Sequence, residues 1–479
     1  MDLIARNKLL AKREMQTTLA KLQALVRKAL PKGSFGSREE AALAICEETV
    51  RGVLLLELTS IARGLGAHVV VDGVAYRQHE SGMGHYASLN GRLDVSRKTY
   101  REVGVRNGPT IVPLELVAGL VEGATPAMAY NVADGYARCD MRQHGEALTL
   151  AHRVPPPRAT LERLAKRIAK EVDEVAPRVE SVIRRGEKLP EGTQAVVMGL
   201  DRTSAPMAEA RPAGASSAPK RTRRAARVRR APVPIDVTYR MAYVGTVSLV
   251  NEVGEALVTR RYAAPACDDP GPLVARMAAD VEAALKREPT LNIGCVQDGA
   301  PEMWNLTRQA LSALEARSVL ALWNEGIDRF HVLERLGKAL EIVEPNPAER
   351  SRRLGKWNAL LDTNDSAIDD IERELTRAYR ELPGARQTHL EEHLVYLENN
   401  KDRMRYVTLA KACLPVGSGV TESTAKTVVN QRAKNSGQRW GEPGLRGVLT
   451  LRAIHHSDRL PRFWDRFSRA YSAVVCQAA

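Results

Sequence analysis

Ala195-Val196-Val197-Met198-Gly199-Leu200 is an uninterrupted apolar run that ends at an acidic residue, Asp201. A short apolar run of this kind is typical of a strand buried on both faces of an α/β sheet. A carboxylate at the end of such a strand projects from the edge of the sheet, where open α/β folds bind their ligands. The run therefore predicts a sheet-based core and makes Asp201 a candidate site residue, with a strand-end cap as the alternative.

The same pattern returns further along the chain. The apolar stretch 291–296 leads into Gln297-Asp298-Gly299, where Asp-Gly is also a common turn. The elements predicted between the two runs are two strands, 236–250 and 256–262, and a helix, 271–286. This alternation indicates an α/β fold in which Asp201 and Asp298 end neighbouring strands.

A third acidic residue, Glu422, follows the Gly-rich turn 415–419 and lies in the first turn of a helix predicted from about Thr421. Lys426, Asn430 and Lys434 follow at intervals of four residues, so they share a slowly drifting helix face with Glu422. The helix dipole favours an acid at this position whatever its role. An acid followed by Lys, Asn and Lys also suits a helix that binds metal at its start and DNA phosphates along its length.

Two acids on neighbouring strands and a third on a facing helix can hold a pair of divalent cations. Mg²⁺, or Mn²⁺, prefers hard oxygen ligands. Two such ions stabilise the attacking and leaving oxygens of a displacement at phosphorus. We therefore expect Asp201, Asp298 and Glu422 to bind two ions for phosphodiester chemistry. His331, in Asp328-Arg329-Phe330-His331, is expected to orient the phosphate or a water beside them.

The sequence around these residues resembles a known family. The blocks that carry the resemblance are 199–207, 296–300, 328–335 and 415–422, and the most specific part is 426–440 followed by 449–453. They are similar to blocks of bacterial DDE transposases, and most of all to the Kra-type insertion-sequence transposases. The Asp-x-x-His element at 328–331 is similar to one in the broader Mutator-like transposases.

The resemblance implies an RNase H-like mixed-sheet catalytic core, with Asp201 and Asp298 as its first two acids and a large helical insertion before Glu422. It also implies an insertion-sequence transposase that binds terminal inverted repeats, cleaves the element ends and joins them to target DNA as a homodimer or larger assembly. A catalytically silent DNA-binding derivative and an RNase H-fold nuclease are the alternatives. The DNA-contacting residues expected near Glu422 are Lys426, Asn430, Arg432, Lys434, Arg439 and Trp440, with a core position as the alternative for Trp440.

Two features depart from the family pattern. Members often carry a Cys-based zinc ribbon near the N-terminus, but the six cysteines here are scattered without a Cys-x-x-Cys pair, which predicts neither a structural zinc nor a disulfide framework. Residues 208–234 are rich in Arg, Ala and Pro and are expected to form a disordered basic loop that binds phosphates, or a tolerated insertion. Asp236, just after this stretch, is a rival for the first acid, but the Pro206-Met207 context favours Asp201.

The N-terminal part is expected to bind DNA. Residues 114–190 contain three predicted helices, at about 127–137, at 142–151 and from 159 onward. Two short helices followed by a third fit a helix-turn-helix reader, and an ordinary helical bundle with a basic exterior is the alternative. The third helix carries the expected DNA-binding residues Arg158, Arg163, Lys166 and Arg167.

The charge of the chain favours a polyanionic partner. Lys and Arg number 71 against 57 acidic residues, for a net charge of +14, and cationic side chains gain affinity for nucleic acid by releasing its counterions. Double-stranded DNA is therefore the expected partner. No apolar run approaches the length of a membrane helix, and the N-terminus lacks the apolar stretch of a signal peptide, so we expect a cytoplasmic protein without membrane contact.

These features together predict a multidomain α/β protein. Its expected parts are a helical region at 1–64, a β-rich segment at 65–113, a helical DNA-binding region at 114–190, the first part of the core at 191–304, a mostly helical insertion at 305–414, and the last part of the core, with the Glu422 helix, at 415–479.

Overall fold

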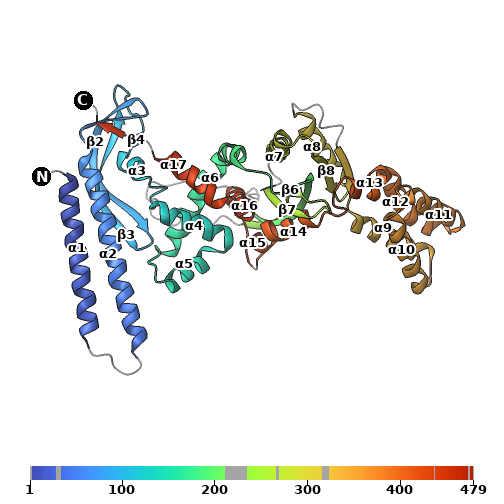
Figure 1. The fold of residues 1–479 in the computed structure, drawn as a ribbon, viewed down its shortest axis with the longest axis horizontal. Coiled ribbons are helices and arrows are strands. Elements are labelled where there is room, and N and C mark those ends of the chain that lie inside the picture. The colour runs from blue at the N-terminus through green and yellow to red at the C-terminus, as the bar shows by residue number, and fades with distance from the viewer. Residues whose placement is uncertain are drawn as a thin grey trace, which may run out of the picture. The chain divides into compact units, whose positions relative to one another are not determined.

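The computed structural model describes residues 3–28, 34–210, 235–265, 269–314, 323–435, 437–472 and 475–477 (Figure 1). The chain forms two compact units, each with its own β-sheet. Unit 1 comprises Met1–Val179 with Asp458–Ala479, and unit 2 comprises Glu180–Ser457. The protein is thus a multidomain α/β protein, as predicted. None of the described helices is long and apolar enough to span a bilayer.

Unit 1 begins with two long helices, α1 (Leu3–Arg27) and α2 (Phe35–Gly64), that pack side by side. The sheet of unit 1 is antiparallel in the order β10-β1-β2-β3-β4. Its strands are β1 (His68–Val71), β2 (Val74–Ser88), β3 (Gly91–Glu102), β4 (Thr110–Ile111) and β10 (Val475–Gln477). Alternate side chains of β3, including Leu93 and Val95, bury one face of this sheet beneath Leu58 and Ala62 of α2.

Three further helices lie where the sequence predicts them, the first two in unit 1 and the third continuing beyond Val179 into the sequence of unit 2. They are α4 (Pro126–Arg138), α5 (Met141–Leu150) and α6 (Arg158–Gly186), preceded by the short α3 (Pro113–Ala118). The side chain of Asp140 caps α5 by accepting hydrogen bonds from the N–H groups of Arg142 and Gln143, at 2.9 and 3.0 Å. An Asp at this position explains why α4 and α5 are separate helices.

The last residues of the chain belong to unit 1, whereas the sequence placed them in the core with Glu422. Helix α17 (Leu460–Tyr471) contacts α4, and β10 pairs with β1. The reason is the aromatic face of α17, where Phe463, Trp464 and Phe467 are buried. The Trp464 ring meets Tyr130 of α4 at a centroid distance of 5.5 Å. The C-terminal segment therefore completes the first unit.

Unit 2 is built on a mixed sheet in the order β7-β6-β5-β8-β9. The strands are β5 (Ala195–Ala210), β6 (Ile235–Val250), β7 (Ala256–Pro265), β8 (Asn292–Gln297) and β9 (Trp323–Ile327). Strands β5, β6 and β7 are antiparallel neighbours, and β8 and β9 run parallel to β5. Strand β9 lies inside the stretch predicted as a helical insertion, which instead begins after this strand. Its sequence Trp-Asn-Glu-Gly-Ile has no apolar pattern by which it could be recognised.

Both faces of this sheet are covered. Val196, Met198 and Leu200 of β5 pack with α7 (Gly271–Arg287) and α8 (Pro301–Ser312). Val197, on the opposite face, belongs to a core shared with the helical insertion. The insertion contains α9 (Arg329–Val343), α10 (Pro347–Leu361), α11 (Ala367–Glu381), α12 (Gly384–Asn400), the 3₁₀ turn η2 (Lys401–Arg403) and α13 (Tyr406–Lys411). Helix α16 (Glu442–His456) packs on β7. Burial on both faces explains the unbroken apolar run of β5.

The docking of α17 gives a stability prediction. Phe467→Ala should lower the free energy of unfolding of unit 1 by about 3–5 kcal/mol, because the ring is fully buried among Phe463, Trp464 and Tyr471. Chemical denaturation measures the loss, and hydrogen exchange should speed up in both α4 and α17. The matched control is Phe35→Ala, whose ring is exposed at the start of α2. Equal losses in the two variants would contradict the placement of α17.

Candidate functional site

The first acid, Asp201, lies where β5 separates from β8. The parallel pairing of the two strands ends at Met198↔Cys295, and β5 continues beside β6 alone as far as Ala210. The prediction that Asp201 ends its strand is therefore wrong, although it does come just after the end of the three-strand parallel region. Because side chains alternate along a strand, Asp201 shares the face of Val197 and Gly199.

The second acid, Asp298, immediately follows β8. Its Oδ1 accepts a hydrogen bond of 3.1 Å from the N–H of Ala300 across a turn in which Gly299 has φ +99°. That positive φ requires glycine, since other residues are strained there. The hydroxyl of Tyr396, from α12, donates to the Asp298 carbonyl at 3.5 Å. Burial raises the pKa of Tyr396 to about 12, so this hydroxyl keeps its proton at neutral pH.

The third acid, Glu422, lies on the short helix α14 (Gly419–Thr424), which packs closely on the sheet. The Oγ1 atoms of Thr421 and Thr246 are hydrogen-bonded at 2.8 Å in a buried contact. A Cβ atom at Gly199 would lie only 2.2 Å from Thr421 Oγ1. Gly199 is thus needed for the close approach that brings Glu422 to the face of β5 that carries Asp201.

The charges of Asp298 and Glu422 both act on Asp201. Burial raises the pKa of Asp201, the hydrogen bond from the Arg202 N–H opposes this, and the negative charges of Asp298 and Glu422 raise it further. The charge of His331 acts in the opposite sense on the same carboxyl group. Asp201, Asp298 and Glu422, named here the carboxylate cluster, therefore come from three separate elements and share one region. The sequence predicted this convergence from strand ends and a helix start.

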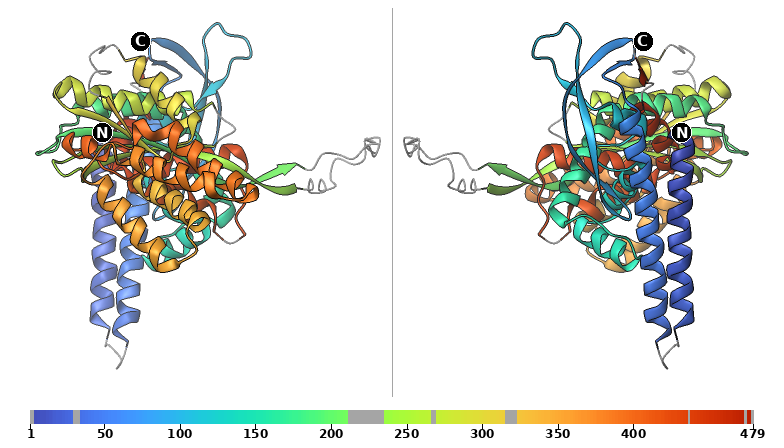
Figure 2. Two further views of the ribbon diagram at one scale, coloured as in Figure 1. Left: turned by 90° about the vertical axis from the view of Figure 1, so that its right-hand side faces the viewer. Right: turned by 90° about the vertical axis from the view of Figure 1, so that its left-hand side faces the viewer.

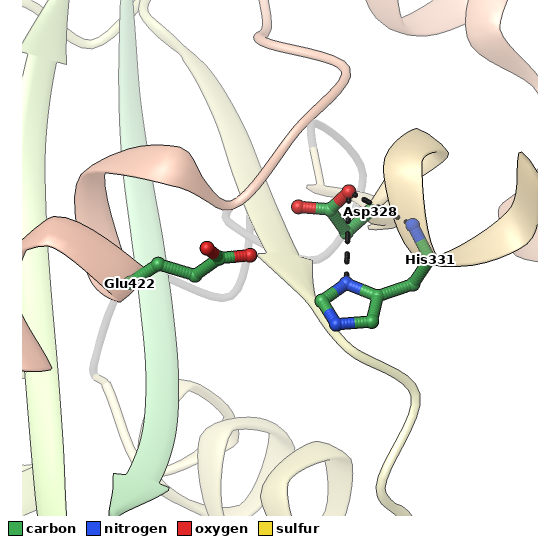
Figure 3. A group of neighbouring side chains, drawn as sticks. All are labelled: Asp328, His331 and Glu422. Carbon is green, nitrogen blue, oxygen red and sulfur yellow. Dashed lines mark hydrogen bonds and ion pairs between the residues drawn. The ribbon is translucent and has the colours of Figure 1, made fainter. Parts of the chain in front are cut away.

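Asp328 is a fourth acid next to the carboxylate cluster. It follows β9, so Asp201, Asp298 and Asp328 all lie at the carboxyl side of the parallel strands β5, β8 and β9. Asp328, His331 and Glu422 each offer one ligand atom within 4.8 Å of the others, and Figure 3 shows Glu422 facing the other two. Among the described residues this is the group whose ligand atoms come this close together, and Asp201 and Asp298 are not part of it.

Hydrogen bonding argues against a ligand role for Asp328. Its Oδ1 caps α9 by accepting from the N–H groups of Phe330 (2.7 Å) and His331 (3.3 Å). Its Oδ2 accepts from the Ser418 N–H and hydroxyl at 2.5 and 2.6 Å. A carboxylate has about four lone-pair sites, and in Asp328, which is 1% exposed, all four are used. Asp328 is therefore a positioning residue.

The contacts of Asp328 connect the segments of the site. Its N–H donates to the carbonyl of Gln297, the residue before Asp298, at 2.9 Å. Ser418, which its side chain holds, is the N-cap of the Glu422 helix. The next N–H, that of Arg329, donates to Val416 in the same Gly-rich turn, also at 2.9 Å. The sequence pattern identified Asp328 only as part of the Asp-x-x-His element that contains His331. The signal that could have revealed its role is an Asp at a strand-to-helix boundary, which is a typical N-cap.

The helix that carries Glu422 is not a regular α-helix. It continues as a π-helical segment, η3 (Ala425–Asn430), and ends with α15 (Gln431–Ala433). Arg452 of α16 donates to the carbonyls of Thr427 and Val428 in that segment. Burial lowers the pKa of Arg452 to about 10, which still leaves it charged at neutral pH. A buried cation thus binds carbonyl groups of the wide turn, and π-helical turns are frequent at functional sites.

The polar row predicted along this helix is partly present. Lys426 Nζ lies 3.7 Å from Glu422 Oε2. Asn430 and Lys434 instead turn toward Thr203 of β5. The Thr203 hydroxyl donates to Asn430 Oδ1 at 3.1 Å and accepts from Lys434 Nζ at 3.2 Å. The wide π-turn rotates the residues that follow it around the helix axis. The predicted four-residue spacing assumed a regular α-helix and did not allow for this rotation.

Two of the residues expected to contact DNA are buried. Trp440 donates from Nε1 to the Ala433 carbonyl at 3.1 Å and forms a β-bridge with Met207. The guanidinium of Arg432 lies over the Trp440 ring, at 4.8 Å from its centroid, and bonds to Gln438. This corrects the expectation for Arg432, and for Trp440 it agrees with the alternative of a core position, because an apolar ring flanked by β5 is better packed inside than exposed. Arg439 is exposed.

The basic residues of α6 belong to unit 1. Arg158, Arg163, Lys166 and Arg167 are all exposed. Arg158 is paired with Glu162, and Arg167 lies 3.4 Å from Glu122. Arg163 and Arg167 line a cavity of about 620 Å³ whose apolar wall includes residues 155–157. These features agree with the alternative of a bundle with a basic exterior as well as with a DNA reader.

Asp236, the rival first acid, lies far from the carboxylate cluster. Asp201 is paired with Val244 in the register of β5 and β6. Asp236 is eight positions away from Val244 on β6, a distance of roughly 26 Å along a strand. The basic segment 211–234, between β5 and β6, lies outside the described residues. Asp201 is therefore the acid that the fold brings to the other two.

No known protein-family model matches this chain, and no curated protein sequence matches it.

The different environments of Asp201 and Asp328 predict opposite changes in stability. Asp328→Asn should lower the free energy of unfolding by about 1–3 kcal/mol, because an amide has one acceptor oxygen and leaves buried donors unsatisfied. Asp201→Asn should raise it at neutral pH, since it removes one charge from the carboxylate cluster and can still accept from Arg202. Urea denaturation in a chelating buffer measures both changes.

The gain from Asp201→Asn should depend on pH. The pKa of Asp201 is raised above its ordinary value of 3.8. The protonated carboxyl group therefore contributes stability that is fully present at pH values below 3.8 and is lost as the pH rises through the folded-state pKa. The free energy of unfolding of Asp201→Asn should therefore exceed that of the wild type most at neutral pH, and the difference should shrink toward pH 3.8. Equal losses of stability in Asp201→Asn and Asp328→Asn would show that the two acids play the same structural role.

Proposed function

We propose that the chain is an insertion-sequence transposase, a metal-dependent enzyme that cleaves and joins DNA strands. The observation that carries the proposal is the carboxylate cluster, in which Asp201 on β5 is subject to the charges of Asp298, just after β8, and Glu422, on α14. The resemblance of the sequence blocks around these acids to DDE transposases supports the same reaction. A plain nuclease, or a silent DNA-binding derivative, would keep the fold and differ in activity.

The topology of unit 2 supports an RNase H-like core. Three antiparallel strands are followed by two strands parallel to the first, and the first strand, β5, is central. An RNase H-like sheet has this order, with its first acid on the central strand and its second beside the fourth strand. Asp201 and Asp298 have these positions. The helical insertion then separates Asp298 from Glu422.

The donor set suits Mg²⁺ or Mn²⁺, two ions of which we propose as the cofactor. Asp201, Asp298 and Glu422 supply carboxylate oxygens, which these hard cations prefer. The negative charges of Asp298 and Glu422 raise the pKa of Asp201, so bound cations would relieve a repulsion that is built into the site. When bound, the ions would lower the pKa of an attacking water or hydroxyl and stabilise the leaving oxygen.

The protein groups around the cluster have separate tasks. The His331 imidazole, whose charge acts on Asp201, would donate a hydrogen bond to a phosphate oxygen or hold a water. Asp328 and Gly199 keep the Glu422 helix in place. Exposed Lys426, Lys434 and Arg439 would bind the DNA backbone.

The proposed partners follow from this reaction. They are the terminal inverted repeats of an element and a target duplex, in keeping with the net charge of +14. The basic surface of α6 would add phosphate contacts. Joining two ends requires two catalytic centres, so we propose a homodimer or larger assembly acting on DNA in a bacterial cytoplasm.

The test is cleavage of DNA that flanks the gene, with Mg²⁺ and products mapped to the nucleotide. Asp201→Asn, Asp298→Asn and Glu422→Gln should each reduce end cleavage and strand transfer by at least about a thousandfold, because each removes a charged ligand. Binding to the same DNA should change little. Asp236→Asn is the matched control and should keep full activity.

Two outcomes would contradict the proposal. Full cleavage by Asp201→Asn together with loss in Asp236→Asn would move the first acid to Asp236. Cleavage without any strand transfer in the wild type would favour a nuclease of the same fold.

His331→Ala gives a further prediction. The variant should lower the cleavage rate more than it weakens DNA binding, because the imidazole lies beside the carboxylate cluster and only part of the DNA affinity comes from it. Single-turnover rates and binding curves separate the two effects. Unchanged cleavage would reduce His331 to a structural residue of the α9 N-terminus.

A further inference from the structure

The cavity of about 620 Å³ beside α6 lies wholly within unit 1. Its walls come from β2 and β3 around their turn, from residues 122–123, and from residues 154–167, which lead into α6. The hairpin of β2 and β3 that supplies the first wall is long and twisted (Figure 2). The volume of the cavity is in the range of ligand sites in proteins, about 300–1,000 Å³.

Backbone hydrogen bonds fix the walls of this cavity. The Val154 N–H donates to the Leu89 carbonyl, and the Ala87 N–H donates to the Gly123 carbonyl, both at 2.9 Å. The three prolines 155–157 follow Val154, and each proline ring fixes its own φ angle. The walls therefore need little ordering to receive a ligand, and preorganisation of this kind lowers the cost of binding.

Most of the surface of the cavity is apolar. Val154, the prolines 155–157 and Leu164 contribute to it. The Thr160 hydroxyl, which also lines the cavity, already accepts a hydrogen bond from Arg163 at 3.2 Å. Val154 is 47% exposed, so the cavity opens to solvent on its side. An apolar ring system suits walls of this kind better than a ligand that must be recognised through many hydrogen bonds.

Cations predominate among the charged side chains that line the cavity, which are Arg92, Arg163, Arg167 and Glu122. Arg92 donates to Asp94 at 2.6 Å, and Arg167 lies 3.4 Å from Glu122. Among the described residues, no acidic side chain forms an ion pair with Arg163. The charge of Arg163 is therefore uncompensated beside an apolar wall. This combination favours a ligand that joins a flat apolar ring to an anion, as a nucleotide does.

A second cavity, of about 350 Å³, adjoins the first. Arg167 lines both, and the second cavity is also lined by the polar side chains of Arg97 and Glu115. Lys166 and Lys170 are exposed on the same helix as Arg167. Two adjoining hollows with a shared cation suit successive units of a strand of bases and phosphates better than one free small molecule.

We propose that the larger cavity holds one unpaired nucleotide of a DNA strand, with its base against the apolar wall and its phosphate at Arg163. The strand continues past Arg167 toward the second cavity. Apolar contact with a base is tolerant of sequence, so the site accepts different bases. This inference rests on DNA as the partner in the proposed function, and it is independent of the carboxylate cluster and of cleavage.

Fluorescence anisotropy of the full-length protein with a labelled single-stranded oligonucleotide, in EDTA, tests the site. A strand of the same length that carries abasic positions should bind the wild type about tenfold more weakly. Arg163→Gln should weaken binding of the intact strand about tenfold, and Arg163→Lys, which keeps the charge, should retain most of the affinity. Arg106→Gln, in the loop between β3 and β4, is the charge-matched control and should change little, because Arg106 is exposed away from the cavity lining.

A pair of valine variants ties the base to the apolar wall. Val154→Ser should reduce the preference for the intact over the abasic strand about threefold, because the base loses apolar contact. Val117→Ser, in α3, is the matched control and should keep the full preference. The two valines are 47% and 41% exposed, so neither change removes a residue of the core.

Three results would overturn the proposal. Equal affinity of the wild type for intact and abasic strands would show that no base is bound. A loss in Arg163→Gln no larger than that in Arg106→Gln would place the phosphate elsewhere. Displacement of the strand by a free nucleoside monophosphate at similar concentration would make the cavity a site for free nucleotides.

The test separates this inference from the proposed function. Binding that ignores the bases refutes the cavity as a nucleotide site and leaves Mg²⁺-dependent cleavage unaffected. Binding that depends on the bases and on Arg163, in a protein that cleaves no DNA, supports the cavity and refutes the enzyme.

Discussion

A single buried carboxylate, that of Asp328, holds together the segments that form the candidate site. Its four hydrogen bonds cap α9 and bind Ser418 at the start of the Glu422 helix. Its own N–H is bonded to the residue before Asp298. Burying a charge is costly unless it is fully hydrogen-bonded. The arrangement is therefore stable only when β8, α9 and α14 take up their positions together.

This constraint explains how mutually repelling acids can be held close together. A carboxylate cluster would relax by separating its members if the backbone allowed it. The contact of Thr421 with Thr246 over Gly199 prevents α14 from moving off the sheet, and Arg452 binds the carbonyls of the π-helical turn that follows. Rigid support of this kind would keep the three acids pre-organised for the cations that we propose they bind.

The parts of the fold that could be predicted from the sequence are those with local signals. The apolar runs before Asp201 and Asp298 identified β5 and β8, and the Gly-rich turn identified the start of the Glu422 helix. Strand β9 was missed because Trp-Asn-Glu-Gly-Ile has no strand pattern, and its pairing with β8 is a long-range contact. The return of α17 to unit 1 is equally non-local. The π-turn is hydrogen-bonded to Arg452 of α16, a long-range contact that spacing rules do not contain.

The central claim is that Asp201, Asp298 and Glu422, and not Asp328, form a site for divalent cations. Mn²⁺ binding followed by electron paramagnetic resonance tests it without any DNA. The wild type and Asp236→Asn should bind Mn²⁺ with the same stoichiometry, and Asp201→Asn, Asp298→Asn and Glu422→Gln should each lose at least one ion or at least about tenfold in affinity. Undiminished Mn²⁺ binding in all three variants would contradict the claim.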